Sequence, residues 1–277
     1  MLGQAVAQEF IKTGFEVTLF ARNTEKAKHI FGSSIQVIEG NLQDALKIEQ
    51  LLQGKDGLYL NLSVDKNSRK SDFQPEREGL DNVLKISKQN KINRIGYLSS
   101  LVSFYQGQNG FNWWVFDLKQ KAVDKIKNCG VPYSIFYPST FMENFDKGAY
   151  RQGNNIGLAG ISKHKMFLIS GNDYGQQVVR SFLLDNGNNE YIVQGSEGFT
   201  ADEAAKFYVD NYTKNKVGII KVPMGMLRFL GLFSNKFNYG AKISEALNNY
   251  PEKFEAEKTW QELGKPQTKF IDYIQQS

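Results

Sequence analysis

The sequence predicts an α/β protein built on a doubly wound parallel sheet. Short apolar runs alternate with amphipathic segments from the start of the chain to about Thr140. Such alternation indicates βαβ units, in which a crossover helix makes successive strands parallel. The apolar runs are continuous, as expected of strands that helices cover on both faces.

The sequence pattern of the first half of the chain predicts ten helices and strands in a regular order. Helices are expected where apolar residues recur at helical spacing, and strands where short apolar runs lie between turn residues. Capping residues mark helix ends: Gly14 and Gly54 each follow a helix, and Asp44 begins one. The expected elements are helix Gln4–Thr13, strand Phe15–Ala21, helix Glu25–Phe31, strand Ser34–Glu39, helix 44–52, strand Leu58–Ser63, helix Glu76–Gln89, strand Ile95–Ser100, helix Trp113–Cys129 and strand Tyr133–Pro138.

Beyond Thr140 the alternation becomes irregular and glycines interrupt the pattern. The expected elements there are a helix near Asp173–Leu184, a strand near Tyr191–Gln194, a helix at Ala201–Thr213 and a mostly helical tail. We therefore expect residues 1–140 to form one domain. Residues 141–277 are expected to form a smaller, mostly helical lobe that partly returns to the main sheet.

Composition excludes several classes of protein. The chain of 277 residues is long enough for one domain with a smaller lobe. A single cysteine, Cys129, excludes a disulfide framework, and His29 and His164 lie far from any other ligand at zinc spacing, so no metal site is expected. The net charge of +5 comes from Lys and Arg interleaved with Asp and Glu, so no nucleic-acid partner is expected.

No segment has the pattern of a signal peptide or of a membrane span. The first residues lack a basic start followed by a long apolar core. The longest apolar run, Val222–Phe233, is shorter than the roughly 20 residues that cross a bilayer and is interrupted by Arg228. The sequence therefore predicts a cytoplasmic protein with no membrane partner.

The start of the chain departs from the usual order. A doubly wound sheet begins with a strand, a Gly-rich turn and then the first helix. Here the helix begins at once, and Gly3 stands where the last glycine of that turn belongs. We expect the first strand to be missing from these 277 residues, and the reading frame upstream of Met1 to encode an apolar strand and a Gly-x-x-Gly turn.

Four segments carry a resemblance to a known family. They are MLGQAVAQEFIKTGFEVTLFARN, EGNLQD, RIGYLSS and GVPYSIFYPSTFMENF. Their order and spacing resemble the atypical short-chain dehydrogenases/reductases, in particular the NmrA-like and isoflavone-reductase-like group, over nearly the whole chain from Gly3. The resemblance implies a Rossmann fold that binds a nicotinamide dinucleotide, and the family's first strand and first two glycines are absent here.

Arg22 predicts that this dinucleotide is NADP. It directly follows the second strand of the expected sheet, where the fold meets the adenosine ribose. An acidic residue at this position selects NAD through the 2′-hydroxyl, whereas an arginine can pair with the 2′-phosphate of NADP. A solvated arginine at a strand end is the alternative interpretation.

The resemblance places further cofactor contacts at the ends of neighbouring strands. Gly3 belongs to the turn below the pyrophosphate. Asn41 and Leu42 follow the next strand beside the adenine, and Asn41 stands where the family usually has Asp. Leu62 and Ser63 end the following strand, where backbone lies against the cofactor. Tyr137 and Pro138 are expected to flank the nicotinamide.

Lys119 is the strongest candidate for a catalytic residue. It falls in the middle of an apolar helical stripe formed by Val115, Leu118, Ala122 and Ile126. A lysine on a buried face must reach a partner or a cavity. The resemblance implies an active-site lysine at this position, to orient the ribose or donate a proton. A lysine that extends from the edge of the stripe into solvent is the equal alternative.

The rest of the classical catalytic set is incomplete. Val115 stands where short-chain dehydrogenases have the tyrosine of Tyr-x-x-x-Lys, so a tyrosine-first mechanism is excluded. Ser99, at the end of the fifth strand, is a weaker candidate for a substrate-facing serine. Since Lys119 lies on an apolar stripe, Lys119→Met is expected to preserve the fold and abolish turnover.

Two functions remain open from the sequence. The first is an NADP-dependent oxidoreductase that acts on a small carbonyl or quinone-like substrate. The second is a non-catalytic NADP(H) sensor that acts through a protein partner, which the absent tyrosine favours. A sugar-nucleotide epimerase is less favoured, because those enzymes also use the tyrosine.

Overall fold

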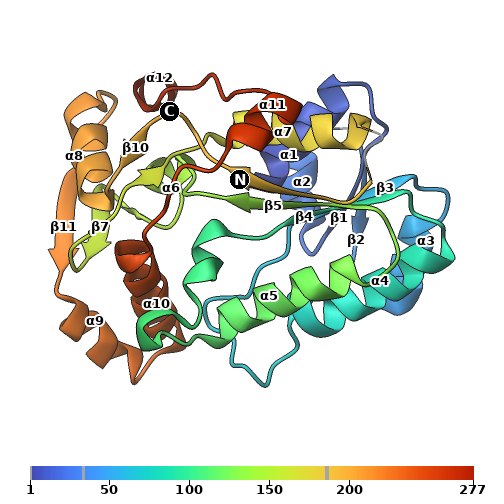
Figure 1. The fold of residues 1–277 in the computed structure, drawn as a ribbon, viewed down its shortest axis with the longest axis horizontal. Coiled ribbons are helices and arrows are strands. Elements are labelled where there is room, and N and C mark those ends of the chain that lie inside the picture. Colours follow the sequence, from blue (N-terminus) through green and yellow to red (C-terminus); the bar gives the residue numbers. More distant parts are fainter. Residues whose placement is uncertain (1, 33–34, 185–186) are drawn as a thin grey trace.

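The computed structural model describes residues 2–32, 35–184 and 187–277 and confirms an α/β fold with a parallel sheet (Figure 1). The larger sheet has the strand order β3-β4-β5-β9, with every neighbouring pair parallel. Its strands are β3 (Gly57–Leu60), β4 (Arg94–Leu98), β5 (Tyr133–Pro138) and β9 (Asn189–Val193). The order agrees with a doubly wound topology.

Helices cover both faces of this sheet (Figure 1). One face carries α3 (Ala45–Leu52), α4 (Leu80–Gln89) and α5 (Trp114–Lys127). The other face carries α1 (Leu2–Lys12), α7 (Gly171–Leu183) and α11 (Glu257–Leu263). Because both faces are covered, all five residues of β4 are buried, as its continuous apolar sequence predicts.

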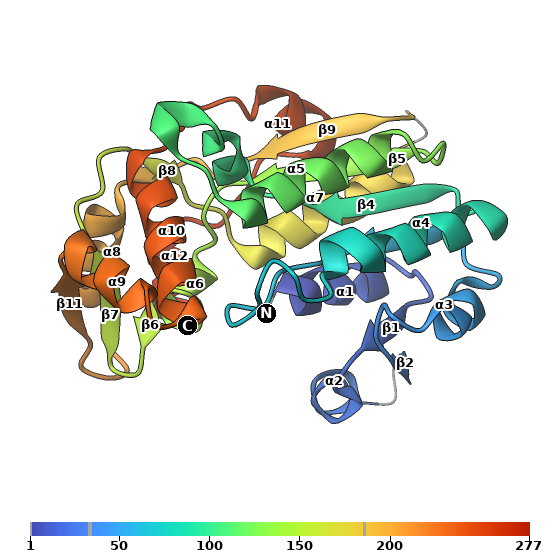
Figure 2. The same cartoon turned by 90° about the horizontal axis from the view of Figure 1, so that it is seen from below.

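Strands β1 (Thr18–Ala21) and β2 (Gln36–Glu39) form a separate parallel pair that is not hydrogen-bonded to the larger sheet. Figure 2 shows this pair, with α2 (Thr24–Phe31), apart from β4, β5 and β9. The sequence predicts both strands to be longer, and Ser34 of the second lies outside the described residues. The edge of β1 that faces away from β2 therefore has no strand partner among the described residues.

Short helical turns connect the strands to α4 and α5. A π-helical turn, η1 (Pro75–Gly79), runs directly into α4. Two 3₁₀ turns, η2 (Leu101–Tyr105) and η3 (Gln108–Gly110), connect β4 to α5. The sequence predicts one helix over Glu76–Gln89, so the π-helical start of that segment is a feature that periodicity does not predict.

The lobe after β5 contains more strand than the sequence predicts. A three-stranded sheet has the order β11-β7-β6, and β8 pairs with β10. These strands are β6 (Arg151–Gln152), β7 (Asn155–Ala159), β8 (Met166–Phe167), β10 (Gly198–Phe199) and β11 (Gly218–Val222). Partners as distant as β7 and β11 meet only through tertiary packing, so the sequence pattern did not reveal them.

After β5 the chain returns to the main sheet through β9, α7 and α11, and the other helices pack elsewhere. They are α6 (Glu143–Asp146), α8 (Ala201–Asn211), α9 (Met224–Gly231), α10 (Asn235–Asn249) and α12 (Phe270–Gln276). Two expected caps are present. Asp44 accepts a hydrogen bond from the amide of Lys47 at 3.0 Å, and Gly14 ends the first helix with φ +89°.

Candidate functional site

A cavity of about 1450 Å³ separates the β1–β2 pair from the larger sheet. Residues from β1 and from β3 both line it, so the two unpaired strand edges border the same space. The volume exceeds the roughly 300–1000 Å³ usual for small-molecule pockets. The cavity is therefore large enough for an elongated ligand together with an additional strand.

Six of the residues predicted to bind the cofactor line this single cavity. They are Gly3, Arg22, Asn41, Leu42, Leu62 and Ser63. They come from the start of α1 and from the segments that directly follow β1, β2 and β3. The carboxyl ends of parallel strands meet at one edge of a sheet, which is where ligands of this fold class bind.

Gly3 lies against the end of β3. A Cβ atom at this position would come within 3.1 Å of Nδ2 of Asn61, so a larger residue would need a shift of that side chain. The missing side chain keeps the first turn of α1 close to the strand, as the resemblance implies for the last glycine of the turn. The first amide groups of a helix have no partners within the helix, and such groups can bind phosphate.

Arg22 is exposed and follows Ala21, the last residue of β1. Its guanidinium makes no hydrogen bond or ion pair with any residue that the structure describes. An arginine at the rim of a cavity, with all its donors unused, suits a phosphate group.

Asn41 uses one of its two polar atoms locally. Its Oδ1 accepts a hydrogen bond from the amide of Gln43 at 2.8 Å, which forms an Asx turn. The side-chain NH₂ group stays available as a donor toward the cavity. The backbone oxygen of Leu42 accepts from Nδ2 of Asn82 at 2.9 Å, which ties this turn to α4.

Lys119 forms a buried ion pair that the sequence does not reveal. Its Nζ lies 2.6 Å from Oε1 of Glu76, whose side chain is fully buried. The hydroxyl of Tyr97 donates to the same oxygen at 2.6 Å, and the ammonium lies 5.7 Å from the centre of the Tyr97 ring. Lys119 is thus neither a free lysine nor one that merely extends into solvent.

Burial and charge set the protonation of this cluster. Burial first, and the neighbouring Glu76 carboxylate second, raise the pKa of Tyr97 well above its usual value. Tyr97 therefore stays protonated at neutral pH and donates its hydrogen bond. The second carboxylate oxygen of Glu76, Oε2, is buried and has no hydrogen-bond partner among the described residues. Glu76 directly follows Pro75, which lines the large cavity, but Glu76, Tyr97 and Lys119 are not themselves among the lining residues.

The remaining predicted residues lie at the ends of β4 (Ser99) and β5 (Tyr137 and Pro138), and none of them lines the large cavity. Ser99 is buried, and its hydroxyl has no hydrogen-bond partner among the residues described. Tyr137 donates from its hydroxyl to Oε2 of Glu190 at 2.7 Å, and burial raises its pKa. Pro138 is buried at the end of the same strand. The hydroxyl of Tyr137 is thus occupied, and only its ring, 4.9 Å from that of Phe104, and its backbone remain for contacts.

Sequence reasoning missed Glu76 and Tyr97. From the sequence alone, Glu76 is interpreted as an ordinary acidic residue in the first turn of a helix. Tyr97 is interpreted as one of the apolar residues of a buried strand. The signal that could have found them is Lys119 itself, because a lysine on an apolar stripe requires a buried acceptor.

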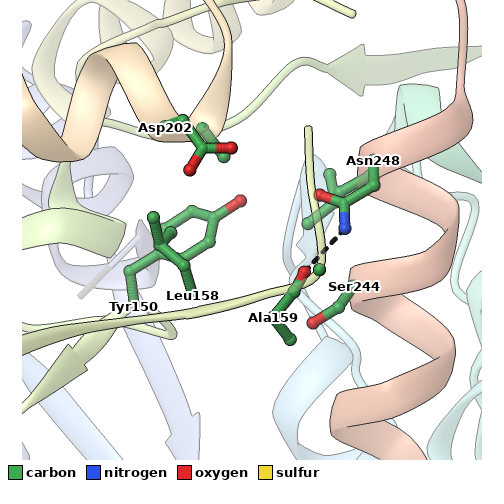
Figure 3. A pocket seen from close by; sticks show the side chains of 9 residues that line it. Tyr150, Leu158, Ala159, Asp202, Ser244 and Asn248 are labelled. Atoms are coloured by element: carbon green, nitrogen blue, oxygen red, sulfur yellow. Dashed lines mark hydrogen bonds between the residues drawn. The ribbon is translucent and has the colours of Figure 1, made fainter. Parts of the chain in front are cut away.

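A second, much smaller cavity lies in the lobe (Figure 3). Its volume of about 10 Å³ is close to the minimum for one water molecule. Tyr150 and Asp202 point into it, and Nδ2 of Asn248 donates to the backbone oxygen of Ala159 at 2.7 Å (Figure 3). This space is too small for a substrate.

The described part of the chain contains neither a cluster of metal ligands nor a helix fit to span a membrane. Between residues 2 and 277, apart from 33–34 and 185–186, no three His, Cys, Asp or Glu gather as metal ligands. Over the same ranges no helix combines the length and the apolar character that crossing a membrane would require.

Known proteins resemble this chain in sequence and in fold. A 2-alkyl-3-oxoalkanoate reductase of Shewanella oneidensis is 30% identical over 110 residues, which cover 39% of this chain and 28% of that protein. The photosystem II assembly factor Ycf39 of Trieres chinensis is 20% identical over 89% of this chain and 76% of its own length. An NADPH-dependent quinone oxidoreductase of Escherichia coli, solved with NADPH, superposes with a TM-score of 0.69 at 18% identity, covering 100% of this chain and 96% of that one.

A family model described as NAD(P)H-binding matches residues 1–166, more than half of the chain. The match includes α1, the β1–β2 pair and every segment that lines the large cavity up to β5. The fold, the family match and the resemblance of the sequence agree. The chain belongs to the NAD(P)H-binding family.

Proposed function

We propose that this protein is a cytoplasmic NADPH-dependent oxidoreductase that reduces a small carbonyl or quinone-like substrate. The observation that carries the proposal is the large cavity, at which the start of α1 and the ends of β1, β2 and β3 converge. The resemblance assigns segments between residues 3 and 63 to the binding of one dinucleotide. In the structure these segments line the same large cavity.

The residues present fit the adenosine half of NADP. Arg22 offers an unpaired guanidinium to a 2′-phosphate, and no acidic residue precedes Glu25 after the strand. Asn41 offers its NH₂ group to an adenine edge. Gly3 lets the start of α1 lie close to the end of β3, where a Cβ would meet Asn61, and the first amides of a helix suit a pyrophosphate.

When bound, the nicotinamide would supply a hydride to the substrate. In this proposal, Lys119 orients the ribose or provides a proton, as the resemblance implies. Glu76 and Tyr97 act through Lys119, because their contacts hold its ammonium in place. Ser99, which follows β4, adds a buried hydroxyl that has no hydrogen-bond partner among the described residues.

The sensor remains the alternative function, because Val115 takes the place of the classical tyrosine. The names of the reductases that resemble this chain favour the enzyme. The name of Ycf39, a photosystem II assembly factor, favours the sensor, because an assembly factor acts on other proteins. Turnover of NADPH distinguishes the two functions, since a sensor binds the cofactor without consuming it.

The test has two stages on the same protein. Calorimetric titration with NADPH and with NADH measures binding and cofactor preference. Oxidation of NADPH is then followed by absorbance with a panel of small aldehydes, ketones and quinones, with the double variant Glu76→Gln/Lys119→Met as the control, because it leaves no unpaired buried carboxylate. Binding of NADPH without turnover of any substrate would support the sensor, and no binding of either cofactor would contradict both functions.

A further inference from the structure

A cluster of exposed apolar side chains lies where α9 meets the start of α10. We call it the apolar corner, and its members are Met226, Phe229, Leu232, Phe233 and Phe237. Leu232 and Phe233 are 77% and 78% exposed, the highest values among the large apolar residues that the structure describes. Folding alone gives no reason to expose two such side chains side by side.

The packing of α9 and α10 leaves the side chains of the apolar corner exposed to solvent. No described side chain of α9 is buried, and Met226, Phe229 and Phe233 follow helical spacing along one face. The rings of Phe229 and Phe233 contact each other at 5.4 Å. At Gly231 a Cβ atom would lie 3.0 Å from Cα of Asn238, so this glycine allows α9 and α10 to pack closely at the corner.

The surrounding sequence is basic throughout. Residues 211–244 contain Lys214, Lys216, Lys221, Arg228, Lys236 and Lys242, and no Asp or Glu. Two of the six are paired: Lys221 with Asp202, and Arg228 with Glu245 of α10 at 3.2 Å. Lys236, which lies between Phe233 and Phe237, makes no ion pair with any described residue. Lys236 therefore places a positive charge, unpaired among the described residues, beside the protruding apolar groups of the corner.

We propose that the apolar corner docks this protein onto an anionic lipid surface. Phe and Leu side chains insert at the boundary between headgroups and acyl chains, while neighbouring lysines contact anionic headgroups. A second copy of the chain is the weaker occupant, because a two-fold contact would bring two basic segments together. This surface revises the expectation of no membrane partner, and it involves no membrane-spanning helix.

The corner lies far from the cofactor cavity. Both views place α9 at the opposite end of the molecule from the β1–β2 pair (Figures 1 and 2). No member of the apolar corner lines the large cavity. Lipid docking is therefore separable from cofactor binding, and its test does not depend on the proposed function.

The experiment is cosedimentation of the full chain with vesicles of phosphatidylcholine alone and of phosphatidylcholine mixed with phosphatidylglycerol. We expect binding to the anionic vesicles that weakens as salt is raised. Leu232→Ser should weaken it about tenfold, the effect of removing one large apolar side chain from the lipid boundary. Leu46→Ser is the matched control, because Leu46 is 72% exposed on α3, and it should bind like the parent.

Three results would overturn the proposal. The first is no binding to either kind of vesicle. The second is equal loss of binding in Leu46→Ser and Leu232→Ser. The third is a stable dimer in lipid-free buffer that Leu232→Ser dissociates, measured by sedimentation velocity, because it would assign the corner to a second copy. Melting curves of both variants, expected to match the parent, show that each is folded.

Discussion

Nζ of Lys119 and Oε1 of Glu76 lie 2.6 Å apart, and the Glu76 side chain is fully buried. This pair changes what the sequence predicts for Lys119→Met. An isolated lysine on an apolar stripe could be replaced without loss. A lysine that neutralises a buried carboxylate cannot, because removing one partner of a buried pair leaves an uncompensated charge.

Lys119→Met is therefore expected to lower the free energy of unfolding by about 3–5 kcal/mol. The double variant Glu76→Gln/Lys119→Met should recover most of this loss, because the amide oxygen of Gln can still accept from Tyr97. Urea denaturation of the parent, both single variants and the double variant measures the coupling. A single variant as stable as the parent would show that the pair contributes nothing.

The double variant also separates structure from catalysis. If Lys119 takes part in the reaction, the stable double variant should bind NADPH and show no turnover. Parent-like turnover in that variant would leave Lys119 with a structural role only.

Arg22→Ala should remove the preference for NADPH over NADH. A hydrogen-bonded pair with a charged group contributes about 1.5–3 kcal/mol, which corresponds to about tenfold or more in affinity. Arg22 is exposed, so the variant should melt at the parent's temperature. Calorimetry that finds equal affinity for the two cofactors in the parent would contradict the assignment of Arg22.

An N-terminal extension should strengthen both the fold and cofactor binding. The unpaired edges of β1 and β3 border one cavity, and each unpaired polar group in a buried region costs about 1–3 kcal/mol. We expect the chain of 277 residues to be less stable, and to bind NADPH less tightly, than a chain in which a further strand pairs with both edges. Fusing an apolar strand and a Gly-x-x-Gly turn before Met1 should raise the melting temperature and tighten NADPH binding.

The control for this experiment is a fusion of equal length that contains proline and polar residues. It cannot pair with two strand edges, because proline lacks the amide hydrogen. Equal melting temperatures for the two fusions would show that the gap does not accept a strand.

Glu252→Gln should reduce the dependence of stability on pH. Burial raises the pKa of Glu252, although it accepts hydrogen bonds from Gln194, Ser139 and the amide of Phe167. The folded state thus binds more protons than the unfolded state between the unfolded pKa, about 4.5, and the raised value. The free energy of unfolding therefore falls as pH rises through this window.

A glutamine keeps these contacts without a charge, because the hydroxyl of Ser139 can also accept. Glu252→Gln is expected to be more stable than the parent at neutral pH, with the difference shrinking toward about pH 4. Urea unfolding at several pH values checks this. A parallel pH dependence in both proteins would show that Glu252 does not cause it.

The sequence by itself determined the parallel α/β fold and the family. Apolar runs such as Ile95–Ser100 and helical spacing such as that of Val115, Leu118 and Ala122 depend on local chemistry, and both appear in the structure as expected. Local signals also predicted the cap at Asp44. They extend over a few residues, so a single sequence carries them completely.

Only the tertiary structure decided the contacts between distant segments. It paired Lys119 with Glu76 across 43 positions, joined β7 to β11, and opened a cavity between β1 and β3. It also left Leu232 and Phe233 in solvent, although their apolar run alone does not distinguish a buried helix from an exposed one. Such outcomes depend on which faces meet in space, and residue spacing along one chain does not specify that.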